Sequence, residues 1–206
     1  MRSCQLNGIL DFQGPDWLSR LSNLEFLDLQ NNMFNNSILS SLGALSSLKG
    51  LYLSDNKLKG IVDFPDSLNN LEALDMSNNE IDKFIFGKGL KKLETLYLLN
   101  VSIHDEISSL LHSLASLPSL KSLDLSSNNF SDSTTTQDLP NFKNLTSLYM
   151  DHTSLDSGFL QMIELMTSIE TISLVNCGLQ STLSPEDGAV IPKFFYHQQY
   201  LRFLDL

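Results

Sequence analysis

Asp151 and His152 are the adjacent side chains in this chain best suited to acid–base chemistry. A histidine beside a carboxylate can act as a general base near neutral pH. The other histidines have no spacing typical of metal ligands, either to this pair or to one another: His104, His112 and His197. We interpret Asp151 and His152 as an exposed polar pair at a turn, with general base catalysis as the alternative.

Two further motifs could carry chemistry, and neither completes a site. Gly87-Lys88-Gly89 lacks the flanking glycine and the Ser or Thr after lysine that a phosphate-binding loop requires. The two cysteines, Cys4 and Cys177, occupy equivalent positions near opposite ends of a repeated pattern, too far apart for a disulfide bond. We expect both to be buried thiols. The sequence therefore predicts no catalytic residues, no cofactor and no metal site.

A repeated segment positions these side chains. Its clearest copy spans Leu117 to Phe130 and reads L-x-x-L-x-x-L-x-L-x-x-N-x-F. Six similar copies begin at Leu21, Leu45, Leu68, Leu90, Phe142 and Met166. This pattern is the leucine-rich-repeat signature. Its alternation of leucine with polar residues predicts a short strand that turns one face to a core and the other to water.

The residue that follows each strand at the turn predicts a ladder of hydrogen-bonding side chains. An asparagine there can both donate to and accept from backbone groups that the bending chain leaves unpaired. The expected ladder residues are Asn32, Asn56, Asn79, Asn128, Thr153 and Cys177, and Cys4 fits the same position before the first copy. Val101 stands in this position without a side-chain donor, so we expect a gap there.

Successive ladder positions are 22 to 28 residues apart, and each interval predicts one coil of a solenoid. Because every coil pairs a strand with a less regular return segment, the stack must curve with its parallel strands on the concave wall. We predict an α/β fold, a leucine-rich-repeat horseshoe of about seven full repeats with partial repeats at both ends. Two return segments, 105–117 and 158–166, have helical spacing and are expected on the convex side.

The repeats span the whole chain, so we predict a single domain over residues 1–206, truncated at both ends, with an irregular insertion at 181–199. The formal net charge of −11 argues against nucleic acid or an anionic membrane as partner. No apolar run approaches the roughly 18 residues that span a bilayer. Residues 1–4 do not open a signal peptide, because no apolar segment follows them.

The outward residues of the strands form the candidate binding surface. Tyrosine alternates with aspartate at the middle position of successive repeats, and rigid tyrosine side chains are enriched at interfaces. The alternative is that tyrosine is only a good strand former and aspartate only a solubilising residue. The candidate ligand contacts are Phe26, Asp28, Tyr52, Asp75, Tyr97, Leu99, Asp124, Tyr149, Asp151 and His152.

Four N-x-S/T triplets are candidate glycosylation sites, at Asn35, Asn100, Asn129 and Asn144. Asn144 is the best of them, because it lies where the chain enters the strand from the outer side. A sugar on Asn100 would stand at the edge of the concave wall and restrict access to it.

The sequence pattern of the repeats resembles that of a known family. The stretch LSSLKGLYLSDNKLKGIVDFP, with Gly60 and Pro65, resembles plant extracellular leucine-rich repeats, although the G-x-I-P element is not clear in it. SLPSLKSLDLSSNNF, FKNLTSLYM and CQLNG are similar to ectodomains of plant receptor-like proteins. The resemblance implies a protein or peptide ligand, a possible co-receptor kinase, and a role in defence or developmental signalling at the plasma membrane. The alternatives are a soluble inhibitor of a cell-wall-degrading glycosidase and the repeat domain of an intracellular immune receptor.

Overall fold

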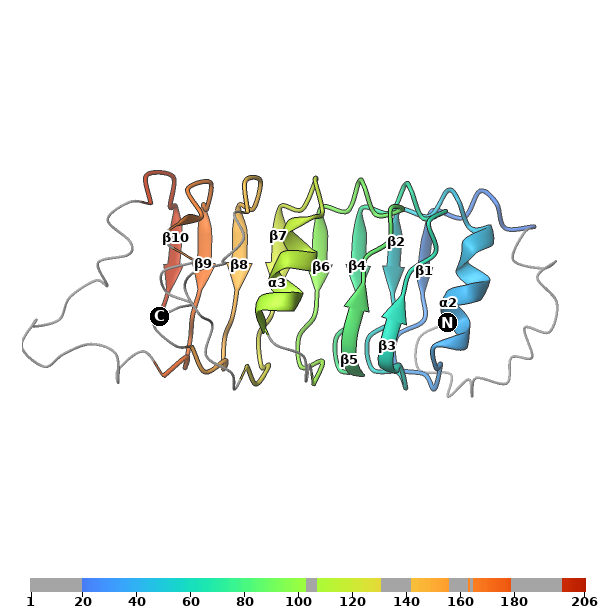
Figure 1. Ribbon diagram of the computed structural model, residues 1–206, viewed down its shortest axis with the longest axis horizontal. Helices are drawn as coiled ribbons and strands as arrows, with labels where there is room; N and C mark the ends of the chain where they lie inside the picture. Colours follow the sequence, from blue (N-terminus) through green and yellow to red (C-terminus); the bar gives the residue numbers. More distant parts are fainter. Residues whose placement is uncertain (1–19, 103–106, 131–141, 156–162, 164, 179–197) are drawn as a thin grey trace, which may run out of the picture.

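The computed structural model describes residues 20–102, 107–130, 142–155, 163, 165–178 and 198–206. In this part of the chain eight short strands form one parallel sheet, in which every strand neighbours the next one along the sequence (Figure 1). The strands are β1 (Phe26–Asp28), β2 (Gly50–Tyr52), β4 (Ala73–Asp75), β6 (Thr95–Tyr97), β7 (Ser122–Asp124), β8 (Ser147–Tyr149), β9 (Thr171–Ser173) and β10 (Phe203–Asp205). The expected curved α/β repeat solenoid with a parallel concave sheet is confirmed.

The strands stack because the alternation predicted from the repeat places their middle side chains in the core. These side chains pair directly across neighbouring strands and are buried from β2 to β9: Leu51, Leu74, Leu96, Leu123, Leu148 and Ile172. One backbone carbonyl before each strand receives two N–H groups of the next coil. The Glu25 carbonyl, for example, accepts from Lys49 at 2.7 Å and from Gly50 at 2.9 Å.

Each coil leaves its strand through a tight turn with a left-handed residue just before the ladder position. These residues have φ between 52° and 57°: Asn31, Asp55, Asn78, Asn100, Ser127, His152 and Asn176. Asn, Asp and His adopt this conformation more readily than most residues other than glycine. The turn therefore explains why short polar side chains precede the ladder in so many coils.

The ladder asparagines tie each coil to the one before it. The Nδ2 group of Asn79 donates to the Leu53 carbonyl of the preceding coil at 3.0 Å and to the Met76 carbonyl of its own coil at 2.8 Å. Its Oδ1 accepts the Leu58 N–H at 3.1 Å. Asn56 and Asn128 make the same kind of bonds. These bonds satisfy buried backbone groups that water cannot reach.

Val101 interrupts this ladder, and backbone groups bridge the gap. Where Asn79 Oδ1 accepts the Leu58 N–H, the backbone carbonyl of Val101 accepts the equivalent N–H of Ile81 at 3.1 Å. The Cys177 carbonyl accepts the equivalent Leu155 N–H in the same way, at 3.4 Å. The chain thus keeps this backbone donor paired even where the ladder position holds no amide.

The return side carries short elements of mixed type: α2 (Ser37–Ser41), the 3₁₀ helix η1 (Leu42–Ala44), β3 (Lys59–Asp63), β5 (Glu80–Ile85) and α3 (Ile107–Ala115). Of the two helices expected there, 105–117 contains α3, whereas 158–166 falls mostly outside the described residues. The repeat pattern did not predict the two-stranded parallel β3–β5 sheet. The insertion expected at 181–199 also lies almost wholly outside the described residues. None of the described helices has the length and apolar character needed to cross a bilayer.

Candidate recognition surface on the concave sheet

The strand register aligns outward side chains into three rows that run across the coils. The first row is Phe26, Gly50, Ala73, Thr95, Ser122, Ser147, Thr171 and Phe203. The central row is Asp28, Tyr52, Asp75, Tyr97, Asp124, Tyr149, Ser173 and Asp205. The third row, two residues further along each coil, is Gln30, Ser54, Ser77, Leu99, Ser126, Asp151 and Val175, and its three serines are buried. The structure therefore brings the sequence-predicted contacts together on one wall, except His152, which lies in the turn that follows the strand.

Aspartate and tyrosine alternate strictly along the central row from β1 to β8. Tyr97 is 38% exposed, whereas Tyr52 and Tyr149 are half-buried by their neighbours. The first row holds small residues between Phe26 and Phe203, so Phe26, next to Tyr52, is the bulky first-row side chain beside the tyrosine rings. The result is a line of aromatic rings separated by carboxylates.

The central aspartates have a structural role at the end of their strands. Oδ1 of Asp75 accepts the Ser77 N–H at 3.0 Å, and Oδ1 of Asp124 accepts the Ser126 N–H at 2.9 Å. Oδ2 of Asp75 also accepts from Nε2 of Gln30 at 3.0 Å, a bond that reaches across the coil between them. These donors are neutral, so the carboxylates are oriented while their negative charge is retained.

The negative charge of these aspartates affects the pKa of Tyr97. Partial burial raises the pKa of its phenol above 10.0, and the carboxylate of Asp75 adds to the shift, followed by smaller contributions that include Asp124. Both effects oppose the phenolate form, because it would be poorly solvated and would stand between two negative groups. The Tyr97 side chain thus remains a neutral hydrogen-bond donor and an aromatic surface at physiological pH.

Phe26 and Tyr52 form an aromatic platform at the β1 end of the sheet. Phe26 is 61% exposed, and its ring lies over Gly50. A Cβ on Gly50 would lie 2.7 Å from Cδ1 of Phe26 and 3.2 Å from Cε2 of Tyr52. Gly50 is therefore the residue that allows both rings to approach the strand backbone.

The third row contains a set of bonds that the sequence did not reveal. Oγ of Ser77 accepts the Leu99 N–H at 3.3 Å, and Oγ of Ser126 accepts the Asp151 N–H at 3.1 Å. In the next coil Oδ1 of Asp151 accepts the Val175 N–H at 2.9 Å and the Ser173 hydroxyl at 2.6 Å. Asp151 therefore replaces a serine as an acceptor between coils.

His152 is not oriented by Asp151 as a catalytic base would be. It occupies the left-handed turn position with φ 56°, and its Nδ1 lies 3.4 Å from Nδ2 of Asn176, the equivalent turn residue of the next coil. The carboxylate of Asp151 is engaged by donors from β9 and the turn that follows it. His152 is thus an exposed turn residue, whereas Asp151 is a half-buried acceptor between coils rather than an exposed partner.

Gly87-Lys88-Gly89 also has a structural explanation. The Lys88 N–H donates to Oδ1 of Asp66 in the preceding coil at 2.8 Å, and a Cβ on Gly89 would lie 2.6 Å from the Asp66 carbonyl oxygen. The glycines permit close packing of two coils. Within the described ranges, no group of three His, Cys, Asp or Glu side chains could hold a metal ion.

Three of the four candidate glycosylation sites have hydrogen-bonded side chains. Oδ1 of Asn35 accepts the Ser37 hydroxyl at 2.7 Å, and Nδ2 of Asn100 donates to Asn78 Oδ1 at 3.0 Å. Nδ2 of Asn144 donates to the Pro118 carbonyl at 2.8 Å. Asn129 is exposed, and the serine of its triplet lies outside the described residues.

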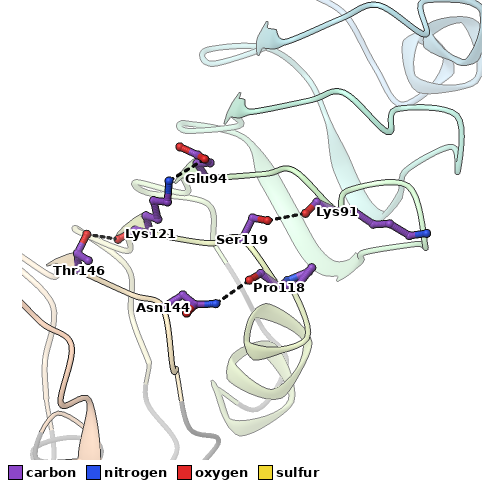
Figure 2. A network of polar contacts seen from close by, with 7 residues as sticks. All are labelled: Lys91, Glu94, Pro118, Ser119, Lys121, Asn144 and Thr146. Carbon is purple, nitrogen blue, oxygen red and sulfur yellow. Dashed lines mark hydrogen bonds and ion pairs between the residues drawn. The ribbon is translucent and has the colours of Figure 1, made fainter.

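Asn144 belongs to a second side-chain ladder at the opposite ends of the strands, which we call the outer ladder. Figure 2 shows Asn144 reaching the Pro118 carbonyl and Ser119 reaching the Lys91 carbonyl at 2.7 Å. Asn70 and Ser168 make equivalent bonds to the coils before them. Lys121 forms an ion pair with Glu94 at 2.8 Å in the same region (Figure 2). Asn144 thus has a structural role as well as a sequon.

Comparison with known proteins agrees with this fold. Leucine-rich-repeat family models match residues 46–87, as two copies, and residues 23–45 and 119–145. Two solved structures share the fold. A TLR13–ssRNA13 complex has a TM-score of 0.57 and 23% identity, over 94% of this chain and 34% of that chain. YopM, a leucine-rich effector from Yersinia pestis, has a TM-score of 0.50 and 24% identity, over 78% of this chain and 38% of that chain.

Relatives with higher identity come from Arabidopsis thaliana. Receptor-like protein 41 is 38% identical over 140 residues, which is 65% of this chain and 15% of that protein. Receptor like protein 21 is 35% identical over 130 residues, which is 63% of this chain and 11% of that protein. Putative receptor-like protein 8 is 44% identical over 81 residues, which is 37% of this chain and 8% of that protein. The chain therefore spans 15% or less of the length of these relatives. The repeats and the fold show a leucine-rich-repeat solenoid whose sequence is similar to plant receptor-like proteins.

Proposed function

We propose that this chain is a non-catalytic recognition module that binds a protein or peptide ligand on its concave sheet. The observation that carries the proposal is the alternation of Asp and Tyr in the central row, with small residues beside it in the first row. Tyrosine supplies a large, rigid contact surface at a low cost in conformational entropy. The carboxylates between the rings supply oriented acceptors.

The proposed setting is the plant cell surface, in defence or developmental signalling. The support for this setting is the similarity to Arabidopsis receptor-like proteins. Ligand contact would act by biasing the association of this protein with a co-receptor kinase. A rigid solenoid suits this role because residues from several coils present one surface without rearrangement.

A peptide-library selection on the immobilised chain tests the binding surface. Peptides enriched on the wild type are measured against a triple variant, Tyr52→Ala, Tyr97→Ala and Tyr149→Ala. The matched control removes three exposed apolar side chains outside the three rows, Met33→Ala, Ile61→Ala and Ile85→Ala, which are 44%, 59% and 43% exposed. We expect the tyrosine variant to lose most of its binding and the control to retain it. Enriched peptides that bind both variants as tightly as the wild type would refute the proposed surface.

A further inference from the structure

We propose that the central row takes an extended, proline-rich peptide with Lys or Arg at every third residue, lying across the strands in a polyproline II conformation. This inference rests on the proposed function of the same wall and adds the chemical class of the partner. Three features carry it: the charge of the wall, the spacing of its carboxylates and the position of its aromatic rings.

The wall is acidic where the rings lie. The central and third rows contain five aspartates and no Lys or Arg: Asp28, Asp75, Asp124, Asp151 and Asp205. Basic residues of neighbouring coils lie at the position just before the strands, where Lys49 pairs with Glu25 at 2.8 Å and Lys121 with Glu94 at 2.8 Å. A cationic ligand would therefore meet two carboxylates, Asp75 and Asp124, whose described donors are neutral, and this agrees with the raised pKa of Tyr97 between them.

The spacing of the carboxylates selects the ligand conformation. Neighbouring strands of a sheet are about 4.8 Å apart, so aspartates on alternate strands are about 9.6 Å apart along the row. A polyproline II helix has three residues per turn and rises about 3.1 Å per residue, so every third side chain returns to the same face after about 9.3 Å. Side chains on one face of an extended β-strand recur every ~6.8 Å instead. Of these two extended conformations, the polyproline II helix is the one that places successive cations opposite Asp28, Asp75 and Asp124.

The aromatic rings lie where such a ligand would place its prolines. Tyr52 and Tyr97 stand on the strands between these aspartates, and aromatic surfaces are the usual platforms for polyproline II segments. Small first-row residues beside them, such as Ala73 and Ser122, leave the approach open. The rings also contact the aliphatic stems of Lys or Arg and attract their charged groups.

The probe is the capped peptide (Pro-Pro-Arg)₄, and its binding to the full chain is measured by isothermal titration calorimetry. One control peptide has the same composition with its arginines in adjacent pairs, and a second carries Glu in place of Arg. We expect (Pro-Pro-Arg)₄ to bind most tightly and the glutamate peptide not to bind. Asp75→Asn and Asp124→Asn should each weaken binding about three-fold, and together about ten-fold. Asp63→Asn on β3 makes the same charge change outside the three rows and should have no effect.

Two results would overturn the inference. Equal affinity of the wild type for the two arginine peptides would show that the spacing of the arginines has no role. Equal affinity of the Asp75→Asn/Asp124→Asn variant and the wild type for (Pro-Pro-Arg)₄ would show that the charge of these aspartates has no role. Failure of (Pro-Pro-Arg)₄ to bind, with tyrosine-dependent binding of library-selected peptides, would reject this partner class and leave the concave recognition surface standing. Failure of both would reject the two proposals together.

Discussion

Substitution of Asn79 tests how much the ladder stabilises the stack. Asn79 is 4% exposed and makes bonds to Leu53, Met76, Ser77 and Leu58. Asn79→Val places in this slot the residue type found at Val101, removing both the donors and the acceptor. Asn79→Thr retains one hydroxyl, as Thr153 does in its own coil, where Oγ1 donates to the Leu125 carbonyl at 3.2 Å.

The expected cost follows from the groups left unpaired. A typical hydrogen bond contributes about 1 kcal/mol net, and a buried group left unsatisfied costs about 1 to 3 kcal/mol. Two groups have Asn79 as their described partner, the Leu58 N–H of the preceding coil and the Met76 carbonyl of its own coil. The Leu53 carbonyl, in contrast, also accepts from Asn56 Nδ2 at 2.9 Å. Asn79→Val should therefore lower the free energy of unfolding by about 3 kcal/mol, and Asn79→Thr by about half as much.

Urea unfolding monitored by circular dichroism measures the loss, and hydrogen exchange locates it. The slope of unfolding free energy against urea should stay unchanged, since the fold is retained. The Leu58 amide should exchange faster in both variants, whereas the Ile81 amide, which donates to the Val101 carbonyl, should remain protected. A loss below 1 kcal/mol for Asn79→Val, or equal losses for Val and Thr, would refute this account of the ladder.

Two further predictions concern titratable side chains. The absorbance difference at 295 nm between wild type and Tyr97→Phe should show a phenol midpoint above pH 10.0, because burial and Asp75 raise the pKa of Tyr97. The corresponding stabilisation of the fold is complete below pH 10 and is lost as the pH rises through the folded-state pKa. A midpoint at or below pH 10.0 would contradict this prediction. Cys177 is 2% exposed, its Sγ donates to the Met150 carbonyl at 2.8 Å, and burial raises the pKa of its thiol. In a Cys4→Ser background iodoacetamide should thus modify the native chain far more slowly than the urea-unfolded chain, as followed by mass spectrometry, and equal rates would show an accessible thiol.

The strand layer was predictable because one motif determines it in every coil. The alternation in L-x-x-L-x-L places its leucines inward, and stacking then forces Tyr52, Asp75 and Tyr97 into one row. The asparagine position follows from the same spacing. A fixed repeat therefore predicts both the concave wall and its outward residues.

The return side was less predictable because it has no constant spacing. The five-residue helix α2 and the β3–β5 pair depend on contacts between neighbouring coils. Phe86 illustrates this, since its ring stacks on Phe64 at 6.1 Å and on Phe84 at 5.5 Å between ring centroids. The roles of Ser77 and Ser126 as acceptors were missed for a different reason. A serine outside a strand carries no signal of the N–H group that lies beside it.

The ladders also give the stack a direction for assembly. The amide of Asn79 completes the turn of the preceding coil by pairing with Leu53 and Leu58, and Asn144 reaches back to Pro118 in the same sense. A coil emerging from the ribosome therefore holds unpaired backbone groups until the next ladder residue follows, 23 residues later in the case of Asn56 and Asn79. Cotranslational folding of this chain should thus lag synthesis by one coil, because each coil needs its successor to close it.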